Sequence, residues 1–209
     1  MRDFIVPSAP PLGYMTLYYF GLNILVEPAR VNCPNIISRS QWTTVPVTHV
    51  NYLIVPIPYV TIHHTEFSPE CNSRETCSSR VNNIREHHMN NLEWNDIGYS
   101  FLIGGDGNVY EGCGWTHEGA HTYGYNKKSV GIAFIGNFEH ENASQIMLNA
   151  AHQLILCGKH LGILRSDVRV VGARQVSSTD NPGKKLYAQI QSWPEWDSSR
   201  MDLGHLVWQ

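Results

Sequence analysis

The chain has 209 residues, of which 42% are hydrophobic, 16% charged and 11% aromatic, and its formal net charge is −3. This length suits one compact domain with a short extension, and the composition excludes disordered, collagen-like and low-complexity chains. Because 18 acidic residues outnumber 15 basic ones, the charge balance argues against nucleic acid as a partner.

Residues 1–30 differ from the rest of the chain. A Pro-rich start precedes the apolar stretch 12–26, which is shorter than the roughly 20 residues of a membrane-spanning helix and is cut off by prolines from the basic start of a signal peptide. A signal-anchor remnant, a truncated gene start and a structured extension remain as interpretations. The last is least favoured, because the stretch has neither helical nor strand periodicity. We therefore expect an extension or linker over 1–30, a domain over 31–198 and a tail over 199–209.

The first elements of the domain lead to a candidate site. The stretch 59–65 (YVTIHHT) is apolar and β-branched until it reaches two histidines, which predicts a buried strand that ends at a site. Val81, Ile84 and His88 recur at helical spacing and predict a helix over 77–91 with one buried face.

The rest of the domain alternates between strands and helices. Strands are predicted over 99–103, 109–111, 130–138 and 168–171, the first two joined through the turn sequence GGDGN as a hairpin. A long helix is predicted over 144–161, with an apolar stripe of Met147, Ala151, Leu154 and Leu161, and a closing helix over 182–193. The order of elements is that of a single α/β domain.

Eleven histidines require that metal or proton chemistry be considered. His63 and His64 are adjacent on the predicted strand and must point to opposite faces of the sheet. Other groups that could converge with them are His87, His88, Tyr99, His117 and His121. A catalytic zinc needs three protein ligands and an open position for water. Spacing alone identifies no such set, and the chain has neither an HExxH motif nor paired CxxC motifs.

A series of motifs, in order, resembles the peptidoglycan recognition protein family, which is related to zinc amidases of the phage-lysozyme type. They are CPNIISRSQW (33–42), YVTIHHT (59–65), the loop 71–77, WNDIGYSFLIGGDGNVYEG (94–112), GAHTYGYNKKSVGIAFIGNF (119–138), GARQVSST (172–179), PGKKLY (182–187) and WPEW (193–196). The resemblance implies an α/β fold with a central mixed β-sheet flanked by helices, and a groove that holds a muropeptide.

Catalytic members of this family bind zinc through two histidines and a cysteine and cut the bond between the lactyl group of N-acetylmuramic acid and L-alanine. The resemblance retains the first ligand as His63 but places Ala173 and Asn181 at the other two positions. Alanine has no donor atom, and an amide is a poor replacement for a thiolate. Tyr99 and Thr179 match accessory catalytic positions. The chain is therefore expected to have no metal, no cofactor and no amidase activity.

The resemblance also carries over groove positions that contact the sugar and stem peptide in relatives. These are His64, Thr65, His88, Trp94, Tyr99, His121, Tyr125 and Asn126. Trp94 is typical of members that bind diaminopimelate-type peptidoglycan. Two positions depart from the family pattern: Glu93 replaces a glycine, and Cys113 replaces the arginine that pairs with the diaminopimelate carboxylate. We call these two positions the corner. Losing such a charge-assisted contact costs about 1.5–3 kcal/mol.

The five cysteines sort into two pairs by the same resemblance. Cys71–Cys77 and Cys33–Cys157 match family disulfides, which leaves Cys113 free. Disulfides indicate an oxidising compartment, so we expect a secreted protein or the ectodomain of a membrane receptor. The triplet 142–144 (NAS) is an acceptor sequence for N-glycosylation.

Three functions follow from these patterns. The first is a receptor of innate immunity that binds peptidoglycan fragments without cleaving them, alone or as a homodimer or heterodimer with related recognition domains. The second is a regulatory co-receptor that has lost peptidoglycan binding, which Glu93 and Cys113 support. The third is an amidase with replacement zinc ligands, which Ala173 and Asn181 argue against.

Overall fold

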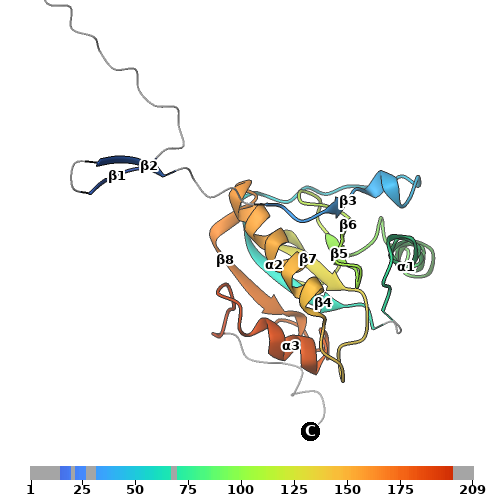
Figure 1. Ribbon diagram of the computed structural model, residues 1–209. Coiled ribbons are helices and arrows are strands. Elements are labelled where there is room, and N and C mark those ends of the chain that lie inside the picture. Colours follow the sequence, from blue (N-terminus) through green and yellow to red (C-terminus); the bar gives the residue numbers. More distant parts are fainter. Residues whose placement is uncertain (1–14, 20–21, 27–31, 67–69, 200–209) are drawn as a thin grey trace, which may run out of the picture. The chain divides into compact units, whose positions relative to one another are not determined.

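The computed structural model describes residues 15–19, 22–26, 32–66 and 70–199 (Figure 1). The chain divides into two units, Met1–Asn32 and Cys33–Gln209. Of the described residues, none lies in a helix long and apolar enough to cross a membrane. The tail from residue 200 onward and most of the predicted extension lie outside the described residues, and the domain limits 31–198 stay a prediction.

The first unit contains a two-stranded hairpin. β1 (Met15–Tyr19) pairs antiparallel with β2 (Leu22–Val26), and only two residues separate the paired Tyr19 and Leu22. A structured extension was the least favoured of the three interpretations, yet this stretch forms two paired strands. Its Tyr, Leu, Ile and Val residues favour strands without strict alternation of polar and apolar positions.

The second unit is built on a mixed six-stranded sheet in the order β3-β6-β5-β7-β4-β8. Its strands are β3 (Ile36–Ile37), β4 (Ile57–His64), β5 (Phe101–Ile103), β6 (Val109–Glu111), β7 (Ser129–Phe134) and β8 (Leu164–Gly172). Only the hairpin pair β5–β6 is antiparallel among the pairs of this sheet. Every residue of the inner strand β7 is buried, as expected for a parallel strand covered on both faces.

Helices cover the two faces of the sheet. α2 (Gln145–His160) and α3 (Lys184–Ile190) contribute to one apolar core. α1 (Arg74–Glu86), which continues as a π-helical turn over His87–Asn91, contributes to the other core. Figure 1 shows α1 and α2 on different sides of the sheet. The predicted fold class is confirmed.

Local sequence explains most of these boundaries, with two corrections. Ser73 begins α1 because its hydroxyl accepts the Thr76 N–H at 3.2 Å, an N-cap bond. The strand predicted to reach residue 138 ends at Phe134, and the chain then turns through Gly136, whose φ is 153°. Leu161 follows the last turn of α2 and is 54% exposed, so it does not belong to the buried stripe.

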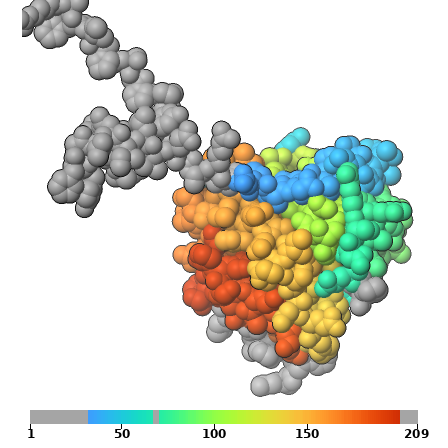
Figure 2. Space-filling view, viewed as in Figure 1, coloured from blue at the N-terminus to red at the C-terminus, as the bar shows by residue number. Residues whose placement is uncertain are grey.

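Two disulfides attach peripheral segments to this frame. Cys71–Cys77 closes the start of α1, and Cys33–Cys157 ties the arm before β3 to α2. Cys113 is free and buried, so the predicted pairing is confirmed. Figure 2 shows the arm, in blue, running over the surface of the domain.

Candidate functional site

Three segments meet at the carboxyl end of β4. His63 is the penultimate residue of this strand, and β8, which lies beside it, leads directly into Ala173. The Asn181 side chain bonds the β4 backbone twice, since its Oδ1 accepts the His64 N–H at 2.8 Å and its Nδ2 donates to the His64 carbonyl at 2.9 Å. The three positions that the resemblance aligns with zinc ligands therefore lie together.

The side chains at these positions do not fit a zinc ion. Ala173 has no donor atom and is buried, and both polar atoms of the Asn181 amide are engaged by the backbone. His63 Nε2 lies 3.1 Å from the Thr122 hydroxyl. In the described part of the chain, no three His, Cys, Asp or Glu side chains gather in a way that could hold a metal. A catalytic zinc site needs three such ligands.

A chain of ring contacts extends from His63. Tyr99 and His121 lie beside it, each with a ring centroid 5.4 Å away, and His88 lies 5.7 Å from Tyr99. Trp94 stacks on His88 at 4.7 Å. We call these five residues the ring cluster. Helix α1, the segment after it and β4 thus bring together side chains from distant parts of the sequence.

Two neighbours fix the position of His121. Its Nδ1 lies 3.1 Å from the Thr122 hydroxyl, which also contacts His63. Its ring lies over Gly131 so closely that any Cβ at this position would collide with it. A glycine in β7 is therefore required for the close approach of the His121 ring to the sheet.

Burial keeps the ring cluster uncharged. Burial lowers the pKa of His88 and of His121 to about 4, and lowers that of His63 well below its ordinary value, with the neighbouring histidines acting in the same direction. Burial also raises the pKa of Tyr99 to about 12. His88 Nδ1 accepts the Gly98 N–H at 3.0 Å, which requires the ring to be unprotonated at Nδ1. Near neutral pH the cluster offers hydrogen bonds and apolar surface without charge.

Other predicted groove residues have partners outside the ring cluster. His64 and Thr65 accept the N–H groups of Phe138 and Gly136, both at 3.1 Å, so His63 and His64 have different surroundings, as strand alternation requires. Tyr125 contacts the Tyr59 ring. Asn126 accepts the Thr122 N–H at 2.7 Å, and Thr179 accepts the Asn181 N–H at 3.2 Å.

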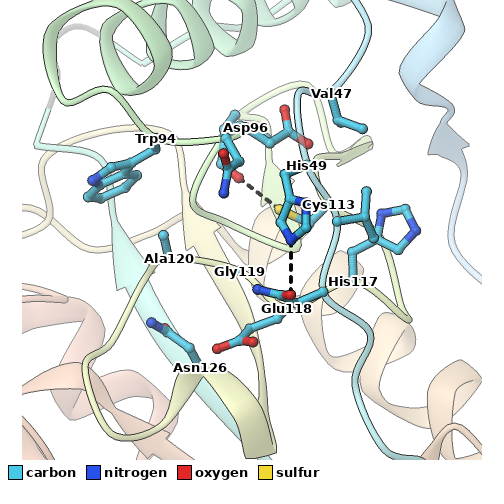
Figure 3. A pocket seen from close by; sticks show the side chains of 14 residues that line it. Val47, His49, Trp94, Asp96, Cys113, His117, Glu118, Gly119, Ala120 and Asn126 are labelled. Atoms are coloured by element: carbon cyan, nitrogen blue, oxygen red, sulfur yellow. Dashed lines mark hydrogen bonds between the residues drawn. The ribbon is translucent and has the colours of Figure 1, made fainter.

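A cavity of about 240 Å³ lies next to the ring cluster (Figure 3). Trp94, Cys113 and Asn126 line it, together with Val47 and residues 49–51 of the segment between β3 and β4 and with the loop 117–120. In Figure 3, Trp94 and Asn126 mark two sides of the cavity, and Cys113 lies behind His49. Its size is below the range of 300–1,000 Å³ usual for whole ligands, so it suits one side chain of a larger ligand.

Comparison with known proteins places the chain in a family. A family model described as N-acetylmuramoyl-L-alanine amidase matches residues 55–184. A peptidoglycan recognition protein of Bombyx mori is 46% identical over 176 residues, which are 84% of this chain and 89% of the relative. The chain belongs to the peptidoglycan recognition protein family.

Solved structures of the family share this fold. The structure of Apis mellifera PGRP-SA is 68% identical, with a TM-score of 0.77 over 78% of this chain and 99% of that one. Peptidoglycan recognition protein LE is 39% identical, with a TM-score of 0.76 over 78% of this chain and 95% of that one. Its structure holds tracheal cytotoxin, a monomeric diaminopimelic acid-type peptidoglycan.

Next to the cavity, Cys113 contributes a buried, uncharged thiol. The Cys113 thiol donates to the Ile97 carbonyl at 2.8 Å, and burial raises its pKa to about 12. The nearby Arg39 is held by Asp96 through two bonds of 2.7 and 2.8 Å. A bidentate arginine of this kind is committed to its partner, so Arg39 is not available to pair with a ligand carboxylate.

Replacing Glu93 with glycine should stabilise the protein. Glu93 is exposed and has a φ of 57°, in the left-handed region that costs non-glycine residues about 1–2 kcal/mol. Glycine loses more chain entropy on folding, which offsets part of this gain. We expect Glu93→Gly to raise the free energy of unfolding by roughly 0.5–1 kcal/mol in a denaturant titration.

Leu92 provides the matched control, because it precedes Glu93 and has an ordinary φ of −100°. Leu92→Gly should lower the free energy of unfolding by roughly 0.5–1 kcal/mol. Equal destabilisation by the two glycine variants would contradict the argument from backbone strain.

Several residues that build the site were not predicted from the sequence. Thr122 joins His63 to His121, and the Arg39–Asp96 ion pair fixes the wall behind Cys113. Thr122 follows His121 inside a family motif, so its position in the sequence was a usable signal. No sequence motif indicated that Val47 and residues 49–51 line the cavity, because this depends on where the segment between β3 and β4 crosses the domain.

Proposed function

We propose that this chain is a receptor of innate immunity that binds muropeptides in the groove at the ring cluster and does not cleave them. One observation carries the proposal. The ring cluster and the adjoining cavity are assembled, whereas two of the three positions aligned with zinc ligands hold Ala173 and an Asn181 engaged by the backbone.

The chemistry of the site supports recognition of an uncharged glycopeptide backbone. His88 and His121 each use Nδ1 within the protein, which leaves Nε2 of each neutral ring to bond the amides and hydroxyls of a muropeptide. Trp94 and Tyr99 add apolar surface for methyl groups and sugar rings. The relative LE binds a muropeptide of this class.

The absence of amidase activity follows from the donor set. An amidase of this family activates water at a metal held by three protein ligands. A lone His63 without histidine or cysteine partners at positions 173 and 181 binds zinc too weakly to lower the pKa of water. The polar contacts of His63 and Asn181 instead connect the ends of β4 and the following loops.

The place of action is extracellular, either as a secreted protein or as the ectodomain of a receptor. Two disulfides, Cys33–Cys157 and Cys71–Cys77, support it, because such bonds persist in oxidising compartments. A homodimer or a heterodimer with a related recognition domain is compatible with this role.

Calorimetric titration of the full chain with diaminopimelate-type and lysine-type muropeptides tests the proposal. We expect saturable binding of one ligand per chain for at least one type. The absence of binding to both would overturn the receptor function.

Restoring the corner should strengthen binding of the diaminopimelate type. The double variant Glu93→Gly/Cys113→Arg removes one negative charge and adds one positive charge next to the cavity. We expect affinity for diaminopimelate-type muropeptide to increase about tenfold or more, since 1.4 kcal/mol corresponds to a factor of ten. Affinity for the lysine type, which lacks the extra carboxylate, should change little.

The single variant Glu93→Gly is the control, since it removes the carboxylate and changes the backbone without adding the arginine. Equal gains for both ligand types would show that the added charge does not read the carboxylate.

A second function, that of a co-receptor without muropeptide binding, is favoured by the same corner. Glu93 adds a carboxylate, Cys113 is buried and Arg39 is paired with Asp96. If neither muropeptide binds even after the corner is restored, the co-receptor function replaces the receptor function.

A further inference from the structure

The triplet Asn142-Ala143-Ser144 is the only Asn-X-Ser/Thr sequence in the chain. It lies in the loop between β7 and α2, at the residue that begins the helix. The loop belongs to the side of the domain covered by α2 and α3, and Figure 2 shows its segment, in yellow, on the surface. Neither the groove nor the metal-ligand positions use it.

The geometry of the loop presents the two outer residues of the triplet to solvent. Gln189 holds the middle residue, because its Oε1 accepts the Ala143 N–H and its Nε2 donates to the Ala143 carbonyl, both at 2.9 Å. Ala143 is buried, whereas Asn142 and Ser144 are exposed. The middle residue is thus an anchor, and the residues on either side of it face outward.

The side chains of Asn142 and Ser144 are not held by other residues. Across the residues described, the Asn142 amide makes no hydrogen bond. Ser144 precedes α2 with φ −65° and ψ 153°, and its hydroxyl forms no cap bond with the helix. Glu141, Gln145 and Ile146 are exposed as well, so the surroundings leave room for a bulky group.

The disulfides supply the second condition. Cys33–Cys157 and Cys71–Cys77 require oxidation during folding, and that takes place in the compartment where Asn-X-Ser/Thr triplets receive oligosaccharides. An exposed triplet in such a chain is accessible to the transferase of that compartment.

We propose that Asn142 carries an N-linked glycan. An N-glycosidic bond forms between Asn142 Nδ2 and C1 of the first N-acetylglucosamine of a lipid diphosphate-linked oligosaccharide. The bond from C1 to the diphosphate oxygen breaks, the lipid diphosphate leaves, and the amide proton passes to a base of the transferase. The glycan then covers Ile146, which is 53% exposed, and excludes this end of α2 as a protein interface.

Mass analysis of the full chain secreted from insect cells tests this proposal. We expect a heavier chain that peptide N-glycosidase reduces to the mass of the unglycosylated chain with Asn142 converted to Asp. Asn142→Gln and Ser144→Ala should each abolish the added mass, and Ser144→Thr should retain it.

Asn149→Gln is the matched control, since Asn149 is also exposed, on α2, but lies outside any triplet; this variant should remain modified. A secreted chain with both disulfides formed and an unmodified Asn142 would overturn the proposal. Persistence of the glycan in Asn142→Gln would do the same.

Discussion

The double variant Ala173→His/Asn181→Cys should bind one zinc ion per chain with sub-micromolar affinity. His63 already lies at the end of β4, and the Arg174 N–H donates to the Asn181 carbonyl at 2.9 Å, so the backbone of all three ligand positions is held together. The variant supplies two imidazoles and a thiolate and leaves a fourth position open, which is the ligand set of a catalytic zinc site. Sub-micromolar binding corresponds to more than about 8 kcal/mol.

Metal analysis after dialysis and titration calorimetry with zinc measure this gain. The single variants Ala173→His and Asn181→Cys are the controls and should bind far more weakly, because each has only two ligands. A folded double variant that takes up no zinc would show that the ligand geometry has been lost. Stoichiometric zinc in the unmodified chain would contradict the proposed loss of the metal.

Acid should destabilise the protein strongly, well above the range in which carboxylates titrate. The pKa of His88 and of His121 is about 4 in the folded protein and about 6.5 when the chain is unfolded. Between these values the unfolded chain binds more protons, so the stability that these residues contribute is complete above pH 6.5 and is lost as the pH falls towards 4.

At pH 5 each of the two histidines should lower the free energy of unfolding by about 2 kcal/mol, or about 4 kcal/mol together. His63 acts in the same direction. Protonation of His88 also removes its acceptor for the Gly98 N–H. Denaturant titrations between pH 7 and pH 5 measure the effect.

His88→Asn separates the contribution of one ring, since asparagine retains an acceptor but does not titrate. The loss of stability between pH 7 and pH 5 should be smaller by about 2 kcal/mol in this variant. Equal stability of the unmodified chain at pH 7 and pH 5 would contradict the inferred burial of uncharged histidines.

Most of the core fold could be predicted from sequence, because its elements are marked by local patterns. The apolar run before His63 correctly predicts β4, and the spacing of Val81, Ile84 and His88 correctly predicts α1 and its buried face. The hairpin β1–β2 could not be predicted in this way. Its strands lack alternation, and such strands are recognised only by their pairing.

The candidate site was predictable as a set of positions and less so as a set of contacts. Family motifs located His63, Tyr99 and His121, but the hydroxyl of Thr122 that links the histidines follows from three-dimensional packing. The same holds for the two bonds of the Asn181 amide to the β4 backbone. These contacts join residues 117 positions apart in sequence, which no local pattern reveals.

One measurement tests both that the protein binds a muropeptide and that it does not cleave it. The full chain is incubated with diaminopimelate-type and lysine-type muropeptides in the presence of zinc, and the ligand that co-elutes with the protein is released and analysed by mass spectrometry. We predict that at least one muropeptide is recovered intact with the protein, with its bond between the lactyl group and L-alanine unbroken. Recovery of separated sugar and peptide, or of no bound ligand of either type, would contradict the account.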